Sequence, residues 1–215
     1  MNRPSLTRRS FLAEVTAAGA ALALAPRSVA ATTSAPEFRS SWHVMPDRPW
    51  AGPECWTNPM QDWRVANGRL ECIKAAPARN VHVLTRALSS GAGTLAMRVQ
   101  VGCVGEAAVA SGKGAAGFSL GVQGPLQEYR NNLIFGTGLE LGLRAKGELF
   151  LGRGAQAITK PVALGSLASV ELRVAVDSPA SGNTARVTLT AHDPASGRVL
   201  AELEKADVPA NSLVG

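Results

Sequence analysis

The sequence predicts an all-β protein folded as a two-sheet antiparallel sandwich. Several short segments alternate apolar and polar residues, turn-forming residues separate these segments, and no heptad repeat or long helical stripe occurs. The composition agrees, because 46% apolar residues, 22 glycines and 13 prolines with only 5% aromatic residues are typical of many short strands joined by glycine turns. After a leader, the remaining length suits one domain with one core.

Two β-hairpins are predicted from their turns. Residues 62–65 and 69–73 are extended runs that flank Asn67 and Gly68. Asn-Gly favours the positive φ angles that a tight hairpin turn needs. The second hairpin joins residues 138–145 to residues 148–151 across Lys146 and Gly147.

The clearest strand is residues 94–103, where every second residue is apolar. One apolar and one polar face are typical of an antiparallel sheet with one buried side. The side chains predicted to point inward are Leu95, Met97, Val99, Val101 and Cys103. Residues 169–177 repeat the pattern with Val170, Leu172, Val174 and Val176 inward, and residues 185–192 with Val187, Leu189 and Ala191. Further strands are predicted at residues 80–88, 115–122 and 198–204, and residues 211–215 look like the start of another.

Residues 1–30 resemble a twin-arginine export signal. Two adjacent arginines and two bulky apolar residues open a mildly hydrophobic run, and the residues concerned are Arg8, Arg9, Phe11 and Leu12. Residues 13–25 form that run, which is shorter than the ~20 apolar residues of a membrane-spanning helix, so no membrane span is expected. The resemblance implies export by the twin-arginine machinery to the periplasm or the exterior, with cleavage after Ala30.

The predicted organisation after this signal is simple. Residues 31–41 are rich in Ala, Thr, Ser and Pro and are predicted to be a flexible lead-in. Residues 42–215 are predicted to be the sandwich domain, cut before its last strand.

The charge pattern argues against a nucleic-acid partner. Lys and Arg number 22 against 16 Asp and Glu, but four arginines and one glutamate lie in residues 1–30, which leaves 18 against 15. These positive charges are scattered and form no stripe interleaved with aromatic residues, as a groove that follows phosphates would require.

Three cysteines are too few for a disulfide framework, and the odd number leaves one thiol unpaired or paired between chains. One interpretation is a bridge between Cys55 and Cys72 across the first hairpin. The other is that Cys72 and Cys103 are small buried strand residues. Folding in the reducing cytoplasm before export makes disulfides less favoured.

Four tryptophans gather near the start of the mature chain, at positions 42, 50, 56 and 63. Large aromatic side chains dominate burial, so packing is the first interpretation. The second is a stacking platform for a sugar ring. Both interpretations stay open at this stage.

No reactive constellation is evident in the sequence. A glucanase sandwich would carry E-x-D-x-x-E, and the chain has no such run. His43, His82 and His192 lie on separate segments, and His82 is predicted to lie at a strand surface or rim. No G-x-S-x-G or phosphate-binding glycine loop occurs. The prediction is that these residues catalyse nothing and hold no metal or other cofactor.

The stretch from Gly52 to Arg86 resembles the segment after the signal peptide in large secreted proteins of the PhoD-like alkaline phosphatase family. Residues 56–64 read W-T-N-P-M-Q-D-W-R, residues 68–72 read G-R-L-E-C, and residues 79–86 read R-N-V-H-V-L-T-R. Residues 130–139 match a further R-x-N-L-x-x-G-x-G-L pattern of the family, and the run continues to Gly142.

The resemblance implies an accessory domain with the jelly-roll of the concanavalin A-like lectins and glucanases, N-terminal to a phosphoesterase domain that holds the metal ions. That downstream domain would be a partner within the same protein, and a carbohydrate is a candidate ligand. The contact surface is predicted from Trp56, Trp63, His82, Arg130 and Asn132. Two alternatives stay open. One is a stand-alone sandwich hydrolase similar to the 3-keto-disaccharide hydrolases, and the other is a purely structural domain without a ligand.

Overall fold

The computed structural model describes residues 37–215 except residues 75, 89–92, 105–113, 127, 166, 180 and 181. Phe38–Gly215 forms one compact unit. The export-signal residues Arg8, Arg9, Phe11 and Leu12 lie outside the described residues, and so does most of the predicted lead-in.

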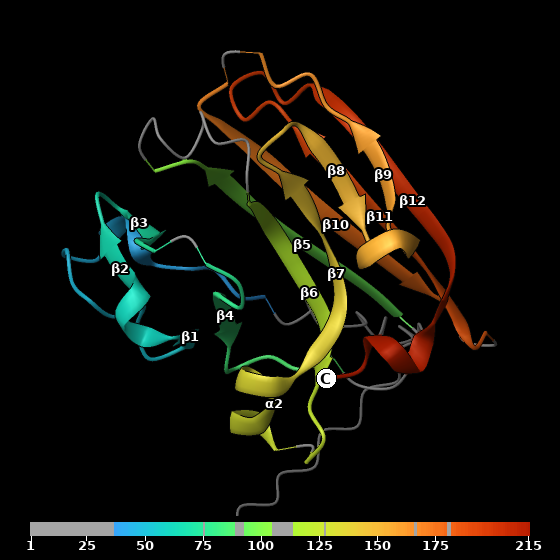
Figure 1. Cartoon of the computed structure of the whole chain (residues 1–215), viewed down its shortest axis with the longest axis horizontal. Helices are drawn as coiled ribbons and strands as arrows, with labels where there is room; N and C mark the ends of the chain where they lie inside the picture. The colour runs from blue at the N-terminus through green and yellow to red at the C-terminus, as the bar shows by residue number, and fades with distance from the viewer. Residues whose placement is uncertain are drawn as a thin grey trace, which may run out of the picture. The chain divides into compact units, whose positions relative to one another are not determined.

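The described part of the chain consists mainly of antiparallel strands, which confirms the predicted all-β class. Sheet 1 has the strand order β12–β11–β10–β5 and sheet 2 the order β6–β7–β8–β9 (Figure 1). The strands of sheet 1 are β5 (Gly93–Gly102), β10 (Ser169–Ser178), β11 (Thr184–His192) and β12 (Val199–Pro209). The strands of sheet 2 are β6 (Ala115–Gln123), β7 (Thr137–Arg144), β8 (Glu148–Leu151) and β9 (Ile158–Pro161).

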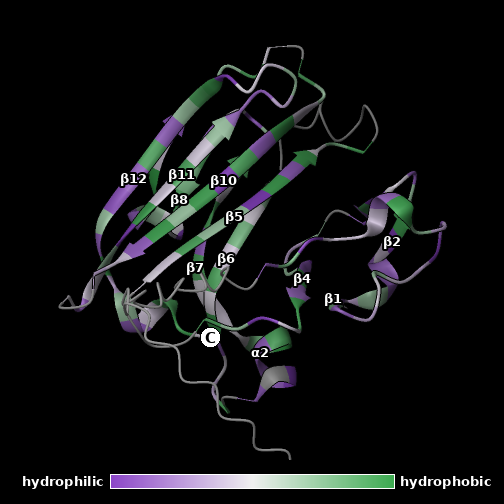
Figure 2. Ribbon diagram, turned by 180° about the vertical axis from the view of Figure 1, so that it is seen from behind, coloured by the Kyte–Doolittle hydropathy of each residue, from purple (hydrophilic) through white to green (hydrophobic). Residues whose placement is uncertain are grey.

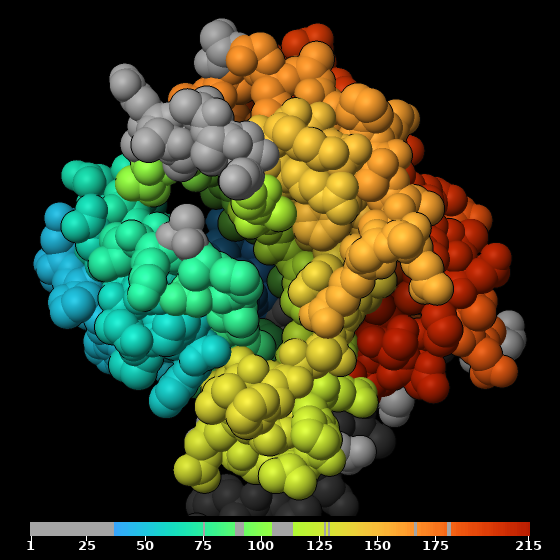
Figure 3. Space-filling model, in the orientation of Figure 1, coloured from blue at the N-terminus to red at the C-terminus, as the bar shows by residue number. Residues whose placement is uncertain are grey.

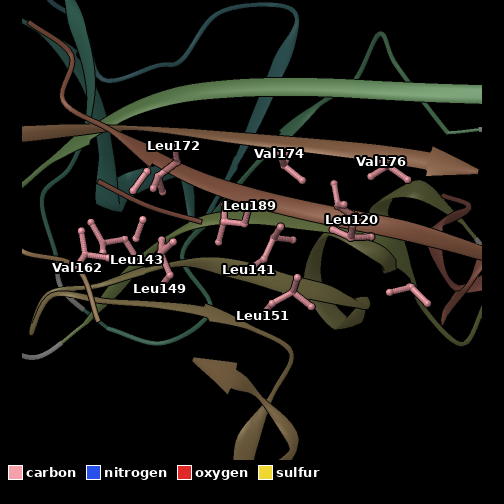
Figure 4. Packing of buried hydrophobic residues seen from close by; sticks show 14 of the residues in the cluster. Leu120, Leu141, Leu143, Leu149, Leu151, Val162, Leu172, Val174, Val176 and Leu189 are labelled. Carbon is pink, nitrogen blue, oxygen red and sulfur yellow. The ribbon is translucent and has the colours of Figure 1, made fainter. Parts of the chain in front are cut away.

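One hydrophobic core lies between the two sheets. Leu172 and Leu189 from sheet 1 and Leu141 and Leu149 from sheet 2 are each 0% exposed (Figure 4). Along β10, the predicted inward residues Val170, Leu172, Val174 and Val176 are all buried, and so are Val187, Leu189 and Ala191 of β11. Figure 2 shows the resulting alternation of hydrophobic and hydrophilic residues along the strands of sheet 1. The predicted faces of these two central strands are therefore confirmed, and the arrangement is consistent with a two-sheet sandwich.

Two smaller sheets precede the sandwich. One pairs β1 (Cys55–Asn58) with β4 (Asn80–Val83), and the other pairs β2 (Trp63–Ala66) with β3 (Arg69–Cys72). The β2–β3 hairpin confirms the Asn-Gly prediction, since Asn67 has a φ of 53° and Gly68 a φ of 71°. The remaining elements of the described residues are the helix α2 (Tyr129–Phe135) and four short 3₁₀ helices at Trp42–Val44 (η1), Met60–Asp62 (η2), Gly154–Gln156 (η3) and Ala210–Leu213 (η4).

Strand β5 departs from the prediction in its burial. Met97 is 37% exposed and Cys103 is exposed, so their predicted burial is wrong. The reason is position, because β5 is an edge strand of sheet 1, with β10 as its one partner among the described strands, and Cys103 follows the end of β5.

Three predicted boundaries also need correction. Strand β4 ends at Val83 rather than residue 88, because its partner β1 has only four residues and the ladder ends at Cys55 opposite Val83. Strand β12 continues to Pro209, since β11 supplies partners as far as Thr184. Ala210–Leu213 is a 3₁₀ helix rather than a strand, although Gly215 and Leu88 then exchange two backbone hydrogen bonds of 3.0 and 3.1 Å.

The three cysteines are free thiols. Cys55 is buried, Cys72 is half-buried and Cys103 is exposed. The structure therefore has no Cys55–Cys72 bridge, and the alternative of buried Cys72 and Cys103 is wrong for Cys103.

Candidate functional site

The β1–β4 ribbon brings two of the predicted site residues face to face. Trp56 lies directly opposite His82, and Asn58 directly opposite Asn80. Residues opposite one another in an antiparallel pair project to the same side, and successive residues alternate. Trp56, Asn58, Asn80 and His82 therefore share one side, which we call the ribbon face. The other side of β1 is closed, because Cys55 and Thr57 are buried.

Helix α2 borders the ribbon face. The Asn80 side-chain nitrogen donates to the carbonyl oxygen of Leu133 at 3.4 Å. Figures 1 and 2 both show α2 beside β4, and in Figure 3 the yellow atoms of α2 lie against the teal atoms of the N-terminal strands. Glu128 caps α2 by accepting a hydrogen bond from the backbone of Asn131. The predicted residues of β1, β4 and α2 thus lie on neighbouring elements.

Two polar atoms of the ribbon face are buried without a hydrogen-bond partner among the described residues. They are Oδ1 of Asn80 and Nε2 of His82. Buried polar atoms are normally paired, because leaving one unpaired costs about 1–3 kcal/mol. Burial also lowers the pKa of His82 below its usual value, so the neutral imidazole is favoured.

Trp56 supplies an aromatic surface beside these atoms. Trp56 is 37% exposed, although it lies in a strand rather than a loop. Trp63 reaches the same strand from β2, because its indole nitrogen lies 3.4 Å from the carbonyl oxygen of Asn58. Three of the five predicted contact residues therefore gather around β1.

The other two predicted residues serve local structure. The Asn132 side-chain oxygen accepts a hydrogen bond of 2.7 Å from the backbone of Gly124, which holds the loop before α2. Arg130 is exposed and forms an ion pair of 3.1 Å with Glu128. Both lie on α2, the helix that borders the ribbon face.

The four tryptophans have separate roles. The indole nitrogen of Trp42 donates to the carbonyl oxygen of Ala51 at 2.7 Å. Trp50 is 43% exposed, and the Arg48 guanidinium lies 4.9 Å from its ring centroid. None of the four belongs to the core between the two sheets in the part of the chain that the structure describes. Packing of the sandwich core therefore does not account for the tryptophan cluster.

Two buried carboxylates fix the elements around the ribbon. Glu71 is 2% exposed and accepts hydrogen bonds from Arg64 at 2.8 and 2.9 Å and from Arg69 at 2.8 Å. These bonds lower the pKa of Glu71, those from Arg64 most. Asp62 pairs with Arg79, the residue before β4. The β2–β3 hairpin and the start of β4 are therefore held by ion pairs that the strand pattern did not predict.

The histidines lie apart, on η1, β4 and β11. His192 is buried and satisfied, with Nδ1 3.2 Å from the carbonyl oxygen of Gly197 and Nε2 2.9 Å from Oγ1 of Thr190. Because a carbonyl can only accept, the contact with Gly197 places a proton on Nδ1. Within the described residues, no three His, Cys, Asp or Glu side chains come together as a set that could hold a metal ion.

A shallow pocket of about 270 Å³ lies elsewhere, at the ends of β7 and β8 beside β12. Arg153 and Glu140 form an ion pair of 2.7 Å across it, and Lys205 completes its charged lining. These residues were not predicted as a site, since Glu140 lies on β7, Arg153 follows β8 and Lys205 lies on β12. None of the predicted contact residues lines this pocket.

Comparison with known proteins adds no assignment: no family model matches the chain, and neither a curated protein nor a solved structure does. Among the described helices, none is both long enough and apolar enough to cross a membrane.

Proposed function

We propose that this chain is an exported, lectin-like accessory module whose ribbon face binds a carbohydrate. One observation carries the proposal: Trp56, which is 37% exposed, lies directly opposite His82 in the β1–β4 ladder. Ligand sites combine aromatic surface with a few fixed polar groups. A pyranose offers matching chemistry, because its C–H face stacks on an indole while its hydroxyl groups hydrogen-bond to imidazole and amide groups.

The wider proposal rests on the resemblance of residues 56–86 to PhoD-like proteins. The module then lies N-terminal to a metal-dependent phosphoesterase domain, and the metal ions belong to that domain. Two antiparallel four-stranded sheets around one core support the further proposal of a concanavalin A-like jelly roll. The twin-arginine motif supports delivery to the periplasm or the exterior.

The binding proposal is tested by a glycan array, followed by calorimetric titration with the best glycan. Trp56→Ala is expected to weaken binding at least about tenfold, as truncation of a central aromatic contact does. Trp50→Ala is the matched control, because Trp50 is also exposed but lies outside the ribbon. Its affinity is expected to stay within about twofold of the wild type. Equal losses in the two variants would contradict the site, and no glycan binding at all would favour a purely structural domain.

A second experiment tests whether this chain has phosphoesterase activity of its own. The chain is incubated with p-nitrophenyl phosphate and divalent metal ions, and no phosphate release above the buffer rate is expected. Release by the chain alone would overturn the accessory role. Hydrolysis of a disaccharide would favour the stand-alone hydrolase instead.

A further inference from the structure

The open edge of β5 is unlike the other three edges of the two four-stranded sheets. The edge strands of these sheets are β5 and β12 in sheet 1 and β6 and β9 in sheet 2. Exposed edges can pair with other chains, and proteins normally block them with charges, prolines, bulges or short strands.

Three of the four edges carry such protection. Strand β9 has only four residues and includes Lys160 and Pro161. Strand β12 has two register irregularities against β11 and ends in Pro209. Strand β6 has an irregularity between Leu120 and Gln123, with Gly121 at a φ of 61°.

Strand β5 is long and regular by comparison. It pairs with β10 over ten consecutive residues without a register shift. It contains no proline and one charged residue, Arg98. Its core side is only partly covered, since Met97 is 37% exposed while Leu95, Val99 and Val101 are half-buried. A long, regular and partly apolar edge is the kind that accepts another strand.

We propose that two copies of this chain associate through antiparallel pairing of their β5 strands. Pairing centred on Met97 gives the two copies the longest overlap without a charge clash. In this register, Met97 faces Met97 of the second copy and Leu95 faces Val99 of the second copy, so apolar residues meet on the core side. On the outer side, Arg98 faces Ala96 of the second copy.

The neighbouring registers of this pairing are less favourable. Centring on Arg98 places two guanidinium groups opposite each other, and like charges directly opposite are destabilising. Centring on Ala96 leaves more of the C-terminal part of β5 unpaired. The charge pattern and the apolar pattern of β5 therefore both fit a second copy of itself, and the pairing would join sheet 1 of each copy into one continuous sheet.

The test is sedimentation velocity on the full chain at about 1 to 300 µM, a range that covers the weak association expected of a small interface. The wild type is expected to show a concentration-dependent dimer. Ala96→Glu places a carboxylate opposite Arg98 of the second copy twice by symmetry, which should tighten the dimer about tenfold. Ala96→Lys places an ammonium there and should weaken it by a similar factor.

The same pair of substitutions at Ala175 is the matched control. Ala175 lies opposite Ala96 on β10 and is also exposed, but it is one strand further from the edge. The dimer constant is expected to change by less than about twofold in Ala175→Glu and Ala175→Lys. A monomer throughout the concentration range would overturn the proposal. So would equal effects of the two substitutions at Ala96, or effects at Ala175 as large as those at Ala96.

Discussion

Trp56 and His82 lie directly opposite each other on β1 and β4, and the buried imidazole nitrogen Nε2 of His82 has no hydrogen-bond partner among the described residues. This relationship places an aromatic surface and an unsatisfied polar atom on the same side of a two-stranded ribbon. It also predicts that His82 contributes to the pH dependence of stability.

Because of His82, the free energy of unfolding should decrease as the pH is lowered from neutral to mildly acidic. Burial lowers its pKa in the folded state, whereas the unfolded value is about 6.5. The unfolded state then binds more protons, so this contribution to stability is present above about pH 6.5 and is lost as the pH falls through the folded pKa. Urea unfolding at pH 7.5 and pH 5.0 should show a smaller drop in His82→Gln than in the wild type.

His43→Gln is the control for this measurement, since His43 is exposed on η1. Its unfolding free energy should follow the wild-type pH dependence. An NMR titration that places the folded His82 pKa at or above 6.5 would contradict the burial argument.

Glu71 should stabilise the β2–β3 hairpin through its two arginines. Glu71→Gln keeps the size of the side chain but removes the charge that accepts from Arg64 and Arg69, so a loss of about 2 kcal/mol is expected. Because those bonds lower the pKa of Glu71, its contribution is present above about pH 4.5 and is lost as the pH falls below that value. Urea unfolding at pH 7 measures the first effect, and its pH dependence measures the second.

Glu202→Gln is the control, because Glu202 is exposed on β12 and should change stability by less than about 0.5 kcal/mol. A loss in Glu71→Gln no larger than this would show that the two arginines are satisfied equally well by water.

Leu189 tests the shared core of the two sheets. It is 0% exposed in the central strand β11, so Leu189→Ala should cost about 2–5 kcal/mol. Leu126→Ala is the comparison, since Leu126 is 74% exposed and should change stability by less than about 0.5 kcal/mol. Far-UV circular dichroism is the suitable probe, because all four tryptophans lie outside this core. Similar midpoints for the two variants would argue against the core.

The strands that could be predicted from the sequence are those with one apolar and one polar face. β10 and β11 are central strands with one side on the core, so every second residue had to be apolar. Strand β9 was missed because all four of its residues are exposed, which leaves no alternation. Helix α2 was missed because it is one short segment of seven residues that includes two asparagines and two aromatic residues, which have low helix propensity, and it is held by the cap from Glu128.

The sequence predicted which residues belong to the candidate site, but not how they are arranged in space. Trp56 and His82 belong to strands that are separated by the whole β2–β3 hairpin, and the β1–β4 pairing leaves no local signal in so short a strand. The arginine partners of Glu71 and Asp62 could not be predicted either. The sequence alone does not distinguish a buried, paired carboxylate from an exposed one. Arg130 and Asn132 were selected by resemblance, and the structure gives both of them local partners.

The three thiols should differ in their reactivity with iodoacetamide in the native protein. Cys103 is exposed and should react first, whereas Cys55 is buried and should react last. Burial and the neighbouring Glu54 carboxylate raise the pKa of Cys55, so less of the reactive thiolate is present at neutral pH. Mass spectrometry of timed samples gives the order. Fewer than three alkylated cysteines after unfolding without a reductant would reveal a disulfide and contradict the free thiols of the structure.

Export should depend on the guanidinium groups of Arg8 and Arg9 rather than on positive charge. The full chain is expressed in a bacterium that has the twin-arginine machinery, and its location and mass are determined after fractionation. The wild type should reach the periplasm or medium, and its mass should indicate cleavage after Ala30. The double variant Arg8→Lys, Arg9→Lys keeps both charges but loses the planar guanidinium groups, so it should remain unprocessed in the cytoplasm. Arg3→Lys is the control and should be exported normally. Export of the double variant at the wild-type level would show that residues 1–30 do not act as a twin-arginine signal, and the proposed delivery route would then be wrong.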